Sequence, residues 1–290
     1  LREIFRDYGK LIILFIAILI SGLFLYLVIS FSSVSKLQVS FLDVGQGDAI
    51  FIETPSGKQM LIDGGVSNVI LKRLSSEISF FDKDIDVVMA THPDADHVTG
   101  LIPVLEKYDV KKIITSVATG ETDVFLDLEK HIEKENAEVH IAYKGDEINF
   151  NDGVSVLVLY PQINYVPKKN DTNDASISVL ITYSNQTFLL TGDLPSVREP
   201  QLVSAGVKKD ITVYKAGHHG SNTSSGEQLL TYIRPEYSVI SAGVGNRYGH
   251  PSPELITRLE KYSKEILSTI VRGTITFLTD GKILEVKTER

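Results

Sequence analysis

The chain of 290 residues is 43% hydrophobic and carries 29 basic against 37 acidic side chains, a net charge of −8. This much apolar material excludes an intrinsically disordered chain, and the acidic balance argues against a protein that grips nucleic acid over its whole surface. The sequence contains no cysteine. Disulfide bonds, thiolate nucleophiles and cysteine-ligated zinc are therefore excluded.

The first predicted element is a long apolar segment near the start of the chain. Residues 11–35 contain no charged side chain. Within them, 11–31 would form a helix of about 31 Å, close to the thickness of the hydrocarbon core of a bilayer. Because Arg2, Arg6 and Lys10 precede this segment, the positive-inside rule places the start of the chain in the cytoplasm.

We therefore expect residues 1–36 to form a single-pass anchor in the cytoplasmic membrane, with residues 37–290 outside the cytoplasm. A cleaved signal peptide is the main alternative, although its apolar region would be unusually long. In a further alternative, 11–31 is the last helix of a longer channel protein.

Residues 37–290 alternate between strand-like and helix-like segments, with no Pro- or Ser-rich linker between them. Amphipathic helices are expected at 98–108, 124–136 and 252–262, where apolar residues recur at helical spacing. So many strands favour two sheets with outer helices, which is an α/β sandwich of the αββα type. The expected strands are 37–44, 48–54, 59–65, 86–90, 111–116, 154–160, 176–183, 186–193, 211–217 and 237–243, with two short runs at 273–279 and 282–287.

Polar clusters follow several of the predicted strands, where rigid scaffolds commonly place catalytic groups. The densest holds His92, Asp94, Asp96 and His97 within six residues. Imidazoles and carboxylates bind first-row metal ions, so this cluster predicts a metal site. The clusters are DGG at 63–65, THPDADH at 91–97, TGD at 191–193, GHHGS at 217–221 and NRYGHP at 246–251.

These strings resemble the metallo-β-lactamase superfamily, and within it the C-terminal domain of ComEC-type competence proteins, which are DNA-uptake channels. The resemblance runs from residue 41 to residue 254. It implies the αββα fold, two divalent cations and hydrolytic chemistry. The strings that carry it are FLDVGQGDAIFI, LIDGG, THPDADHVTGL, NDASISVLI, FLLTGDL, KAGHHGS and NRYGHPSPE.

The resemblance also implies roles for individual residues. His92 and Asp94 fall on the positions of the first metal, and Asp96 and His97 fall on those of the second. Asp193 falls on the bridging carboxylate, whose two oxygens can serve two cations. Asp96 is expected to be catalytic as well as a metal ligand.

Three further positions follow from the same resemblance. His218 is preferred as the remaining ligand of the second metal, and the adjacent His219 is expected to be a catalytic or substrate contact. Asp63 is expected to orient the metal loop through hydrogen bonds. The last ligand of the first metal is Asp174, or Asn173 as a neutral oxygen donor.

The expected ligand set is rich in oxygen, because Asp94, Asp96, Asp174 and Asp193 would face two divalent cations. Hard oxygen ligands favour manganese, and zinc is the other main candidate because of its higher intrinsic affinity. Magnesium is a third possibility for such a site.

Four more residues are candidates for contact with the substrate. Arg247 could pair with a phosphate through its planar guanidinium, and His250 could protonate a leaving oxygen. Gln46 and Asp48 lie on a glycine-flanked turn that we expect at the rim of the same cleft. Their alternative roles are structural: a solvated loop charge, a hydrogen bond or a turn-forming carboxylate.

Together these features predict a membrane-anchored, extracytoplasmic, metal-dependent phosphodiesterase or nuclease. The resemblance implies DNA as substrate, and a DNA-uptake channel as a partner besides the lipid bilayer. Two alternatives stay open. One is a hydrolase of another small ester, phosphodiester or lactam, and the other is a catalytically weak module that guides DNA.

Overall fold

The computed structural model describes residues 2–32, 36–167 and 171–290. Contacts within the chain divide it into two compact units, Leu1–Ser35 and Lys36–Arg290. The first unit contains one helix, α1 (Arg2–Ser32). Its described side chains, those of Tyr8, Lys10 and residues 12–25, are all exposed. Among the described residues, no helix is both long and apolar enough to cross a membrane. The membrane anchor therefore stays a prediction.

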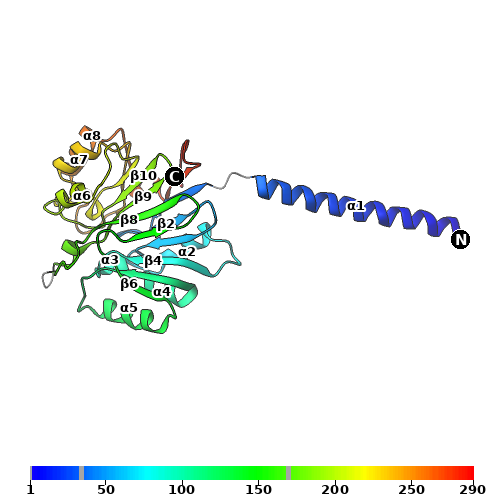
Figure 1. Ribbon diagram of the computed structural model, residues 1–290, viewed down its shortest axis with the longest axis horizontal. Coiled ribbons are helices and arrows are strands. Elements are labelled where there is room, and N and C mark those ends of the chain that lie inside the picture. Colours follow the sequence, from blue (N-terminus) through cyan, green and yellow to red (C-terminus); the bar gives the residue numbers. More distant parts are fainter. Residues whose placement is uncertain (1, 33–35, 168–170) are drawn as a thin grey trace. The chain divides into compact units, whose positions relative to one another are not determined.

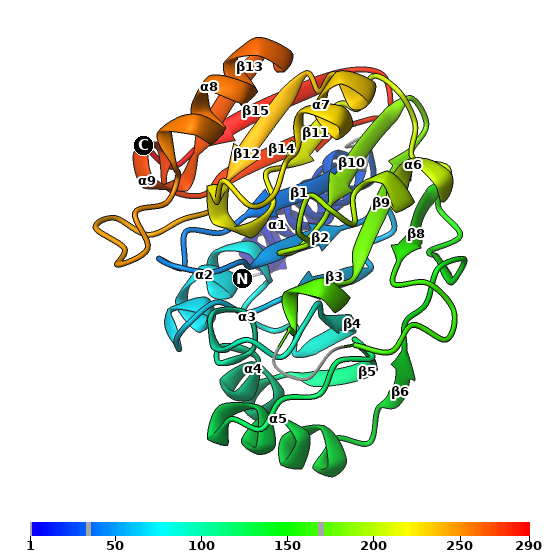
Figure 2. The ribbon, with the colours of Figure 1, turned by 90° about the vertical axis from the view of Figure 1, so that its left-hand side faces the viewer.

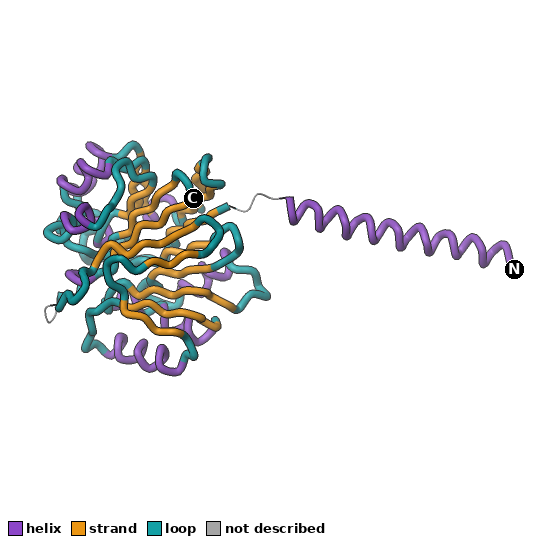
Figure 3. Tube along the Cα trace, viewed as in Figure 1, coloured by secondary structure: helices purple, strands orange, loops and turns teal. Residues whose placement is uncertain are grey.

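The second unit contains two mixed sheets (Figure 3). The eight-stranded sheet has the order β15 (Leu284–Thr288), β14 (Ile275–Thr279), β1 (Leu37–Phe41), β2 (Ile50–Glu53), β3 (Gln59–Ile62), β4 (Asp84–Ala90), β5 (Asp109–Thr115) and β6 (Glu138–Ile141). The seven-stranded sheet has the order β13 (Glu265–Ser268), β12 (Tyr237–Ile240), β11 (Val213–Lys215), β10 (Gln186–Leu190), β9 (Ser178–Tyr183), β8 (Val154–Tyr160) and β7 (Glu147–Asn149).

Helices cover the outer face of each sheet (Figures 1 and 2). They form two groups: the first group of helices packs on the eight-stranded sheet, and the second group packs on the seven-stranded sheet. The first group is α2 (Val69–Glu77), α3 (Ala95–Val98), α4 (Leu101–Lys107) and α5 (Asp123–Lys134). The second group is α6 (Pro200–Ser204), α7 (Glu227–Ile233) and α8 (Pro253–Tyr262); a short α9 (Thr269–Arg272) follows β13, and 3-10 turns span Asn173–Ala175 and His218–Gly220.

The main apolar core lies between the two sheets. Inward-facing residues of both sheets form it, among them Phe41, Phe188 and Phe277, which are fully buried. The ring centroid of Phe277 lies 5.9 Å from that of Phe41 and 6.0 Å from that of Phe188, so one aromatic side chain joins the sheets. Two further apolar clusters lie under the outer helices. The predicted αββα sandwich is confirmed.

The predicted helices begin where local capping chemistry allows it. At the start of α8 the Ser252 hydroxyl accepts a hydrogen bond from the Leu255 amide, and Pro253 occupies the first turn. At the start of α5 the Thr122 hydroxyl accepts from the Phe125 amide. The sequence patterns did not predict the short helices α2, α6, α7 and α9 or the strands β6, β7 and β13. Each of these is at most nine residues long, too short for a clear periodic pattern.

Candidate metal centre

Asp63 follows β3 and holds the loop after β4 in place. One carboxylate oxygen accepts a hydrogen bond from the Thr91 amide at 2.8 Å, and the other accepts from the Thr91 hydroxyl at 2.7 Å and from His97 Nδ1 at 2.8 Å. His97 Nδ1 is therefore engaged, and its Nε2 is left to face the site. Such a carboxylate–histidine pair orients a metal-binding imidazole and raises its basicity. This geometry agrees with the supporting role expected for Asp63.

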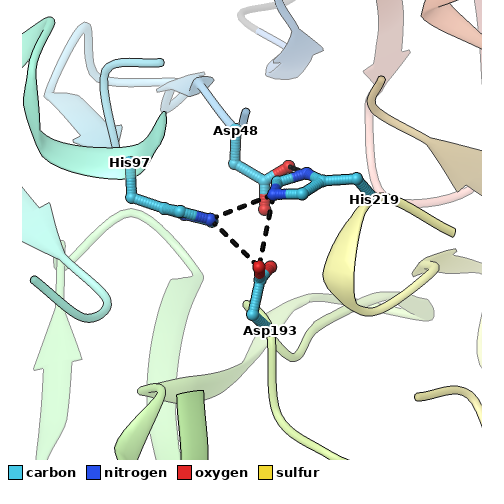
Figure 4. A group of neighbouring side chains, drawn as sticks. All are labelled: Asp48, His97, Asp193 and His219. Atoms are coloured by element: carbon cyan, nitrogen blue, oxygen red, sulfur yellow. Dashed lines mark hydrogen bonds and ion pairs between the residues drawn. The ribbon is translucent and has the colours of Figure 1, made fainter. Parts of the chain in front are cut away.

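Four buried side chains from both sheets meet in a group that we call the inner cluster: Asp48, His97, Asp193 and His219 (Figure 4). The Nε2 atoms of His97 and His219 are 3.1 Å apart, and each lies 3.3 Å from Oδ2 of Asp193. Asp96 Oδ2 lies 3.3 Å from the same His219 nitrogen. Donors around a tetrahedral zinc ion, at ~2.1 Å from the metal, are ~3.4 Å apart. The spacing of these atoms thus fits one cation.

A second group of donors shares Asp193 with the inner cluster. His92 Nε2 lies 3.8 Å from Asp94 Oδ2 and 4.0 Å from Asp193 Oδ2. His92 Nδ1 contacts the Thr91 hydroxyl at 3.0 Å, while its buried Nε2 makes no hydrogen bond within the described residues. Oδ1 of Asp193 is likewise buried without a hydrogen bond there. Buried polar atoms normally find a partner, so these two atoms are available to bind a second cation.

The electrostatics of the site favour positive charge at the centre. Burial opposes the charged form of the His97 and His219 imidazoles, but the carboxylate of Asp193 outweighs it and raises the pKa of both rings well above the usual range. The same two rings hold the pKa of Asp193 well below its usual value, against the effect of burial. Burial and the neighbouring His97 lower the pKa of His92 to about 3. The His92 imidazole is thus neutral at neutral pH.

Asp48 lies behind His219 rather than at the rim of a cleft, which corrects the expectation from the sequence. It is 1% exposed, its Oδ2 lies 2.6 Å from Lys215 Nζ, and its Oδ1 lies 3.3 Å from His219 Nδ1. That nitrogen also donates to the Ser241 carbonyl at 3.2 Å. Because Asp48 faces Nδ1, on the side of the ring away from the other donors, it positions His219. Lys215 was missed, because its position in an apolar strand carries no signal of chemistry.

The geometry of the two adjacent histidines favours roles opposite to those expected from the sequence. His219 is buried within the inner cluster, whereas His218 is 29% exposed and its Nε2 lies 3.6 Å from Asp193 Oδ2. Both residues have a positive φ, 51° and 54°, in the turn after β11. This turn breaks the alternation of the strand, which is why sequence spacing could not distinguish the two rings. The geometry favours His219 as the ligand and leaves His218 on the open side.

Asp174 does not join either group of donors, contrary to expectation. Its two oxygens accept from Arg198 Nε at 2.7 Å and from Nη2 at 2.6 Å, and the Tyr165 hydroxyl also hydrogen-bonds to it. Oδ1 of Asn173 is buried and has no hydrogen bond within the described residues. Of the two alternatives, the neutral Asn173 oxygen is therefore the one left available. Arg198 is 24 residues from Asp174 in the sequence, and no local sequence pattern predicts that the two side chains pair.

Of the remaining substrate candidates, Arg247 and His250 lie on the loop after β12, and Gln46 lies on the loop between β1 and β2. The His250 ring lies 5.7 Å from that of His218, and its buried Nδ1 has no hydrogen bond within the described residues. Arg247 is exposed and stacks over the Tyr248 ring at 4.8 Å. Gln46 accepts a hydrogen bond from the Gly243 amide at 3.3 Å, so it ties two loops together. The His218 and His250 rings are thus neighbours, and Arg247 is exposed on the same loop as His250.

Several known proteins are similar to this chain in sequence. A family model described as "Metallo-beta-lactamase superfamily" matches residues 42–154. ComE operon protein 3 of Bacillus subtilis is 26% identical over 269 residues, covering 86% of this chain and 34% of that protein. Competence protein ComA of Neisseria gonorrhoeae is 27% identical over 246 residues, covering 84% of this chain and 32% of that protein.

Two further proteins are similar in part. Exodeoxyribonuclease WalJ of Streptococcus pneumoniae is 28% identical over 123 residues, covering 40% of this chain and 44% of that protein. Among solved structures, the diiron β-hydroxylase CmlA from Streptomyces venezuelae superimposes with a TM-score of 0.53 at 12% identity, covering 83% of this chain and 54% of CmlA. This last likeness concerns the fold alone.

The chain spans about a third of the length of ComE operon protein 3 and of ComA. The similarity nevertheless covers most of this chain and includes the loops that carry the donors. The chain has the metallo-β-lactamase fold, and over most of its length it is similar to these two proteins.

Proposed function

We propose that this protein is a metal-dependent phosphodiesterase that cleaves DNA outside the cytoplasmic membrane. The observation that carries the proposal is the buried Asp193 carboxylate, which lies between the His97–His219 pair and His92. A carboxylate shared by two sets of donors suits a pair of cations, and a pair of cations suits a phosphodiester. The similarity to Competence protein ComA and to Exodeoxyribonuclease WalJ supports DNA as the substrate.

The described residues would divide the work between holding metal and handling the substrate. His97, His219 and Asp96 would hold one cation, His92 and Asp94 the other, with Asp193 shared and Asn173 able to add an oxygen. When bound, such cations stabilise the charge of phosphate oxygens and acidify water. Manganese and zinc are the two metals to test first, with magnesium third.

The side chains on the open side supply proton transfer and orientation. Burial lowers the pKa of both His218 and His250, so each ring is neutral at pH 7 and can accept a proton and pass it to a leaving oxygen. Arg247 could pair with the phosphate through its guanidinium. With a net charge of −8, affinity for DNA would come from this local region and the cations.

The proposal includes the location of the protein. α1 (Arg2–Ser32) would anchor the chain in the cytoplasmic membrane, with Lys36–Arg290 outside. A lipid bilayer and a DNA-uptake channel are the partners consistent with this placement. The uncharged stretch at 11–35 and the basic residues before it support this part of the proposal.

A substrate panel tests the chemistry. Residues 37–290 would be offered single- and double-stranded DNA, bis-p-nitrophenyl phosphate and nitrocefin, each with manganese, zinc or magnesium. We expect metal-dependent cleavage of the small diester and of DNA. Asp96→Ala controls for a contaminating nuclease, and Asp123→Ala, which removes an exposed carboxylate at the start of α5, is a matched control that should keep activity. Hydrolysis of nitrocefin alone would refute the proposal, and cleavage of the diester without DNA would remove the nuclease assignment.

A further inference from the structure

Two phenylalanine rings are exposed to solvent in the loop between α2 and β4. Figure 1 labels these two elements. Phe80 is 82% exposed and Phe81 is 89% exposed, and their ring centroids lie 5.3 Å apart in an edge-to-face arrangement. Within the described part of Lys36–Arg290, no other phenylalanine is exposed to this extent. An exposed aromatic pair carries a cost in water unless something covers it.

The loop is built to hold these rings outward. Ile78, just before them, is buried, and its amide donates to the Leu74 carbonyl at 2.8 Å. Just after them, the Asp82 amide donates to the Ser79 carbonyl at 2.9 Å, and the Asp82 carboxylate accepts from Gln59 Nε2 at 2.9 Å. Both ends of the loop are therefore fixed to the domain.

The sheet topology places this loop at the end of the eight-stranded sheet where the chain enters the domain. We call this end the edge of the domain. β1 pairs antiparallel with β2, β2 antiparallel with β3, and β3 parallel with β4, so β1 and β4 begin at the same edge. The three strand spacings between them amount to ~14 Å. Ile283, 65% exposed, lies on the same edge, because Leu37 of β1 pairs with Thr279 at the end of β14.

The metal centre lies at the opposite ends of these strands. Asp63 follows the end of β3, and His92 follows the end of β4. The uncharged stretch 11–35 ends directly at Lys36, and Leu37 begins β1. If that stretch spans a bilayer, only a few residues separate the membrane surface from the edge that carries Phe80 and Phe81. Because each residue extends the chain by at most ~3.6 Å, this edge must then lie near the membrane surface.

We propose that Phe80 and Phe81 insert into the interface of the bilayer that holds the anchor, so that the metal centre faces away from the membrane. The inference rests on the anchoring proposed above. Aromatic rings are well suited to the headgroup region. Two cations on this edge are paired within the protein, Lys36 with Glu285 and Lys58 with Asp86. A third, Lys83, is exposed beside the rings, with its Nζ 5.5 Å from the centroid of the Phe80 ring, where it can reach a lipid phosphate while the rings make the apolar contact.

The chain contains no tryptophan, so single tryptophans report on their surroundings without background. The full chain would be reconstituted into phosphatidylcholine vesicles with and without lipids brominated near the headgroup, as three variants. Phe81→Trp tests the loop, Ile18→Trp tests the anchor, and Val197→Trp reports on a valine that is 74% exposed in the loop after β10, close behind Asp193. Phe80→Trp replaces the first variant if that variant folds poorly.

We expect brominated lipid to remove most of the emission of Phe81→Trp and Ile18→Trp, and to leave that of Val197→Trp unchanged. Quenching of Ile18→Trp without Phe81→Trp would overturn this inference and keep the anchor. Quenching of Phe81→Trp alone would keep the docking and overturn the anchor. Equal quenching of Phe81→Trp and Val197→Trp would also overturn the inference, because the contact with lipid would then be non-specific. A blue shift of Phe81→Trp without quenching would overturn it too, because the ring would then be buried against protein.

Discussion

The carboxylate of Asp48 and the ammonium of Lys215 form an ion pair with 2.6 Å between Oδ2 and Nζ, and both side chains are at most 1% exposed. The pair joins the turn after β1 in one sheet to β11 in the other. Its second carboxylate oxygen faces His219 Nδ1 at 3.3 Å. A fully buried charge pair therefore lies directly behind one of the candidate metal-binding rings.

Breaking this pair should affect both stability and metal binding. Lys215→Met leaves a buried carboxylate without its cation, which should cost about 3–5 kcal/mol of unfolding free energy in chelated protein. The same change should weaken metal affinity ~10–100-fold, because Asp48, which orients His219, loses the cation that holds it in place. Urea unfolding and competition with a metal indicator would measure the two effects.

Two variants sharpen the test of that pair. Asp48→Asn with Lys215→Met should recover part of the lost stability, because no uncompensated charge remains. Lys261→Met breaks an exposed pair with Glu227 and should change little. Unaltered metal affinity in Lys215→Met would show that the pair has no part in positioning His219.

Asp193 should contribute to more than one cation. Its Oδ2 lies 3.3 Å from the Nε2 atoms of His97 and His219 and 4.0 Å from that of His92. Asp193→Ala should therefore lose both metal ions, whereas His97→Ala should retain part of the metal. Elemental analysis of protein saturated with manganese would decide. A wild-type stoichiometry below two would contradict the pair of cations.

The adjacent histidines should respond differently to substitution. We expect His219→Ala to lower the metal content, because the ring is buried among the donors. His218→Ala should leave the metal content nearly unchanged and lower kcat on bis-p-nitrophenyl phosphate, since the ring is on the open side. Equal metal loss in both variants would return His218 to the ligand set.

Glu199 should make the stability of the domain depend on pH. Burial raises the pKa of this carboxyl to about 7, although it accepts hydrogen bonds from the Ser225 and Gly226 amides. The pKa of Glu199 is higher in the folded than in the unfolded protein, so its protonated form stabilises the fold. This contribution to the free energy of unfolding is complete below about pH 4.5 and is lost as the pH rises through 7. The loss is of the order of 3 kcal/mol.

Urea unfolding between pH 4 and pH 8, in the presence of a chelator, would test this dependence. Glu199→Gln removes the titration, so the difference in unfolding free energy between wild type and variant should change across that range. The exposed Glu227→Gln serves as the control. A difference that stays constant from pH 4 to pH 8 would contradict the raised pKa.

The orientation of the chain can be tested in cells. We expect external protease to digest Lys36–Arg290 in intact spheroplasts while the domain remains with the membrane fraction. If the domain is instead protected from external protease, the proposed orientation is reversed. Domain released into the medium would indicate cleavage after the apolar segment.

Local patterns in the sequence predicted the fold well. Alternating apolar runs and the motifs at their ends placed His92, His97 and Asp193 at strand termini, where the structure has them. Contacts between distant segments could not be predicted in this way. Asp48 and Lys215 are 167 positions apart, and neither local sequence shows that the other charge is near.

The errors in the site have the same origin. Asp174 was expected as a ligand because a carboxylate is the stronger donor, and only the folded chain brings Arg198 to both of its oxygens. The choice between His218 and His219 depends on a turn with positive φ at two successive residues. Such backbone conformations are uncommon outside glycine, so spacing alone does not reveal them.

The donors of the metal centre come from both halves of the sandwich. His92, Asp94, Asp96 and His97 follow a strand of one sheet, while Asp193 and His219 follow strands of the other. A cation held between them would act as a cross-link that closes a loop of about 100 residues. In a chain without cysteine, a bound metal ion would thus cross-link the two sheets as a disulfide bond would. Removing the metal with a chelator should therefore make the chain near the contact between the two sheets more sensitive to proteases.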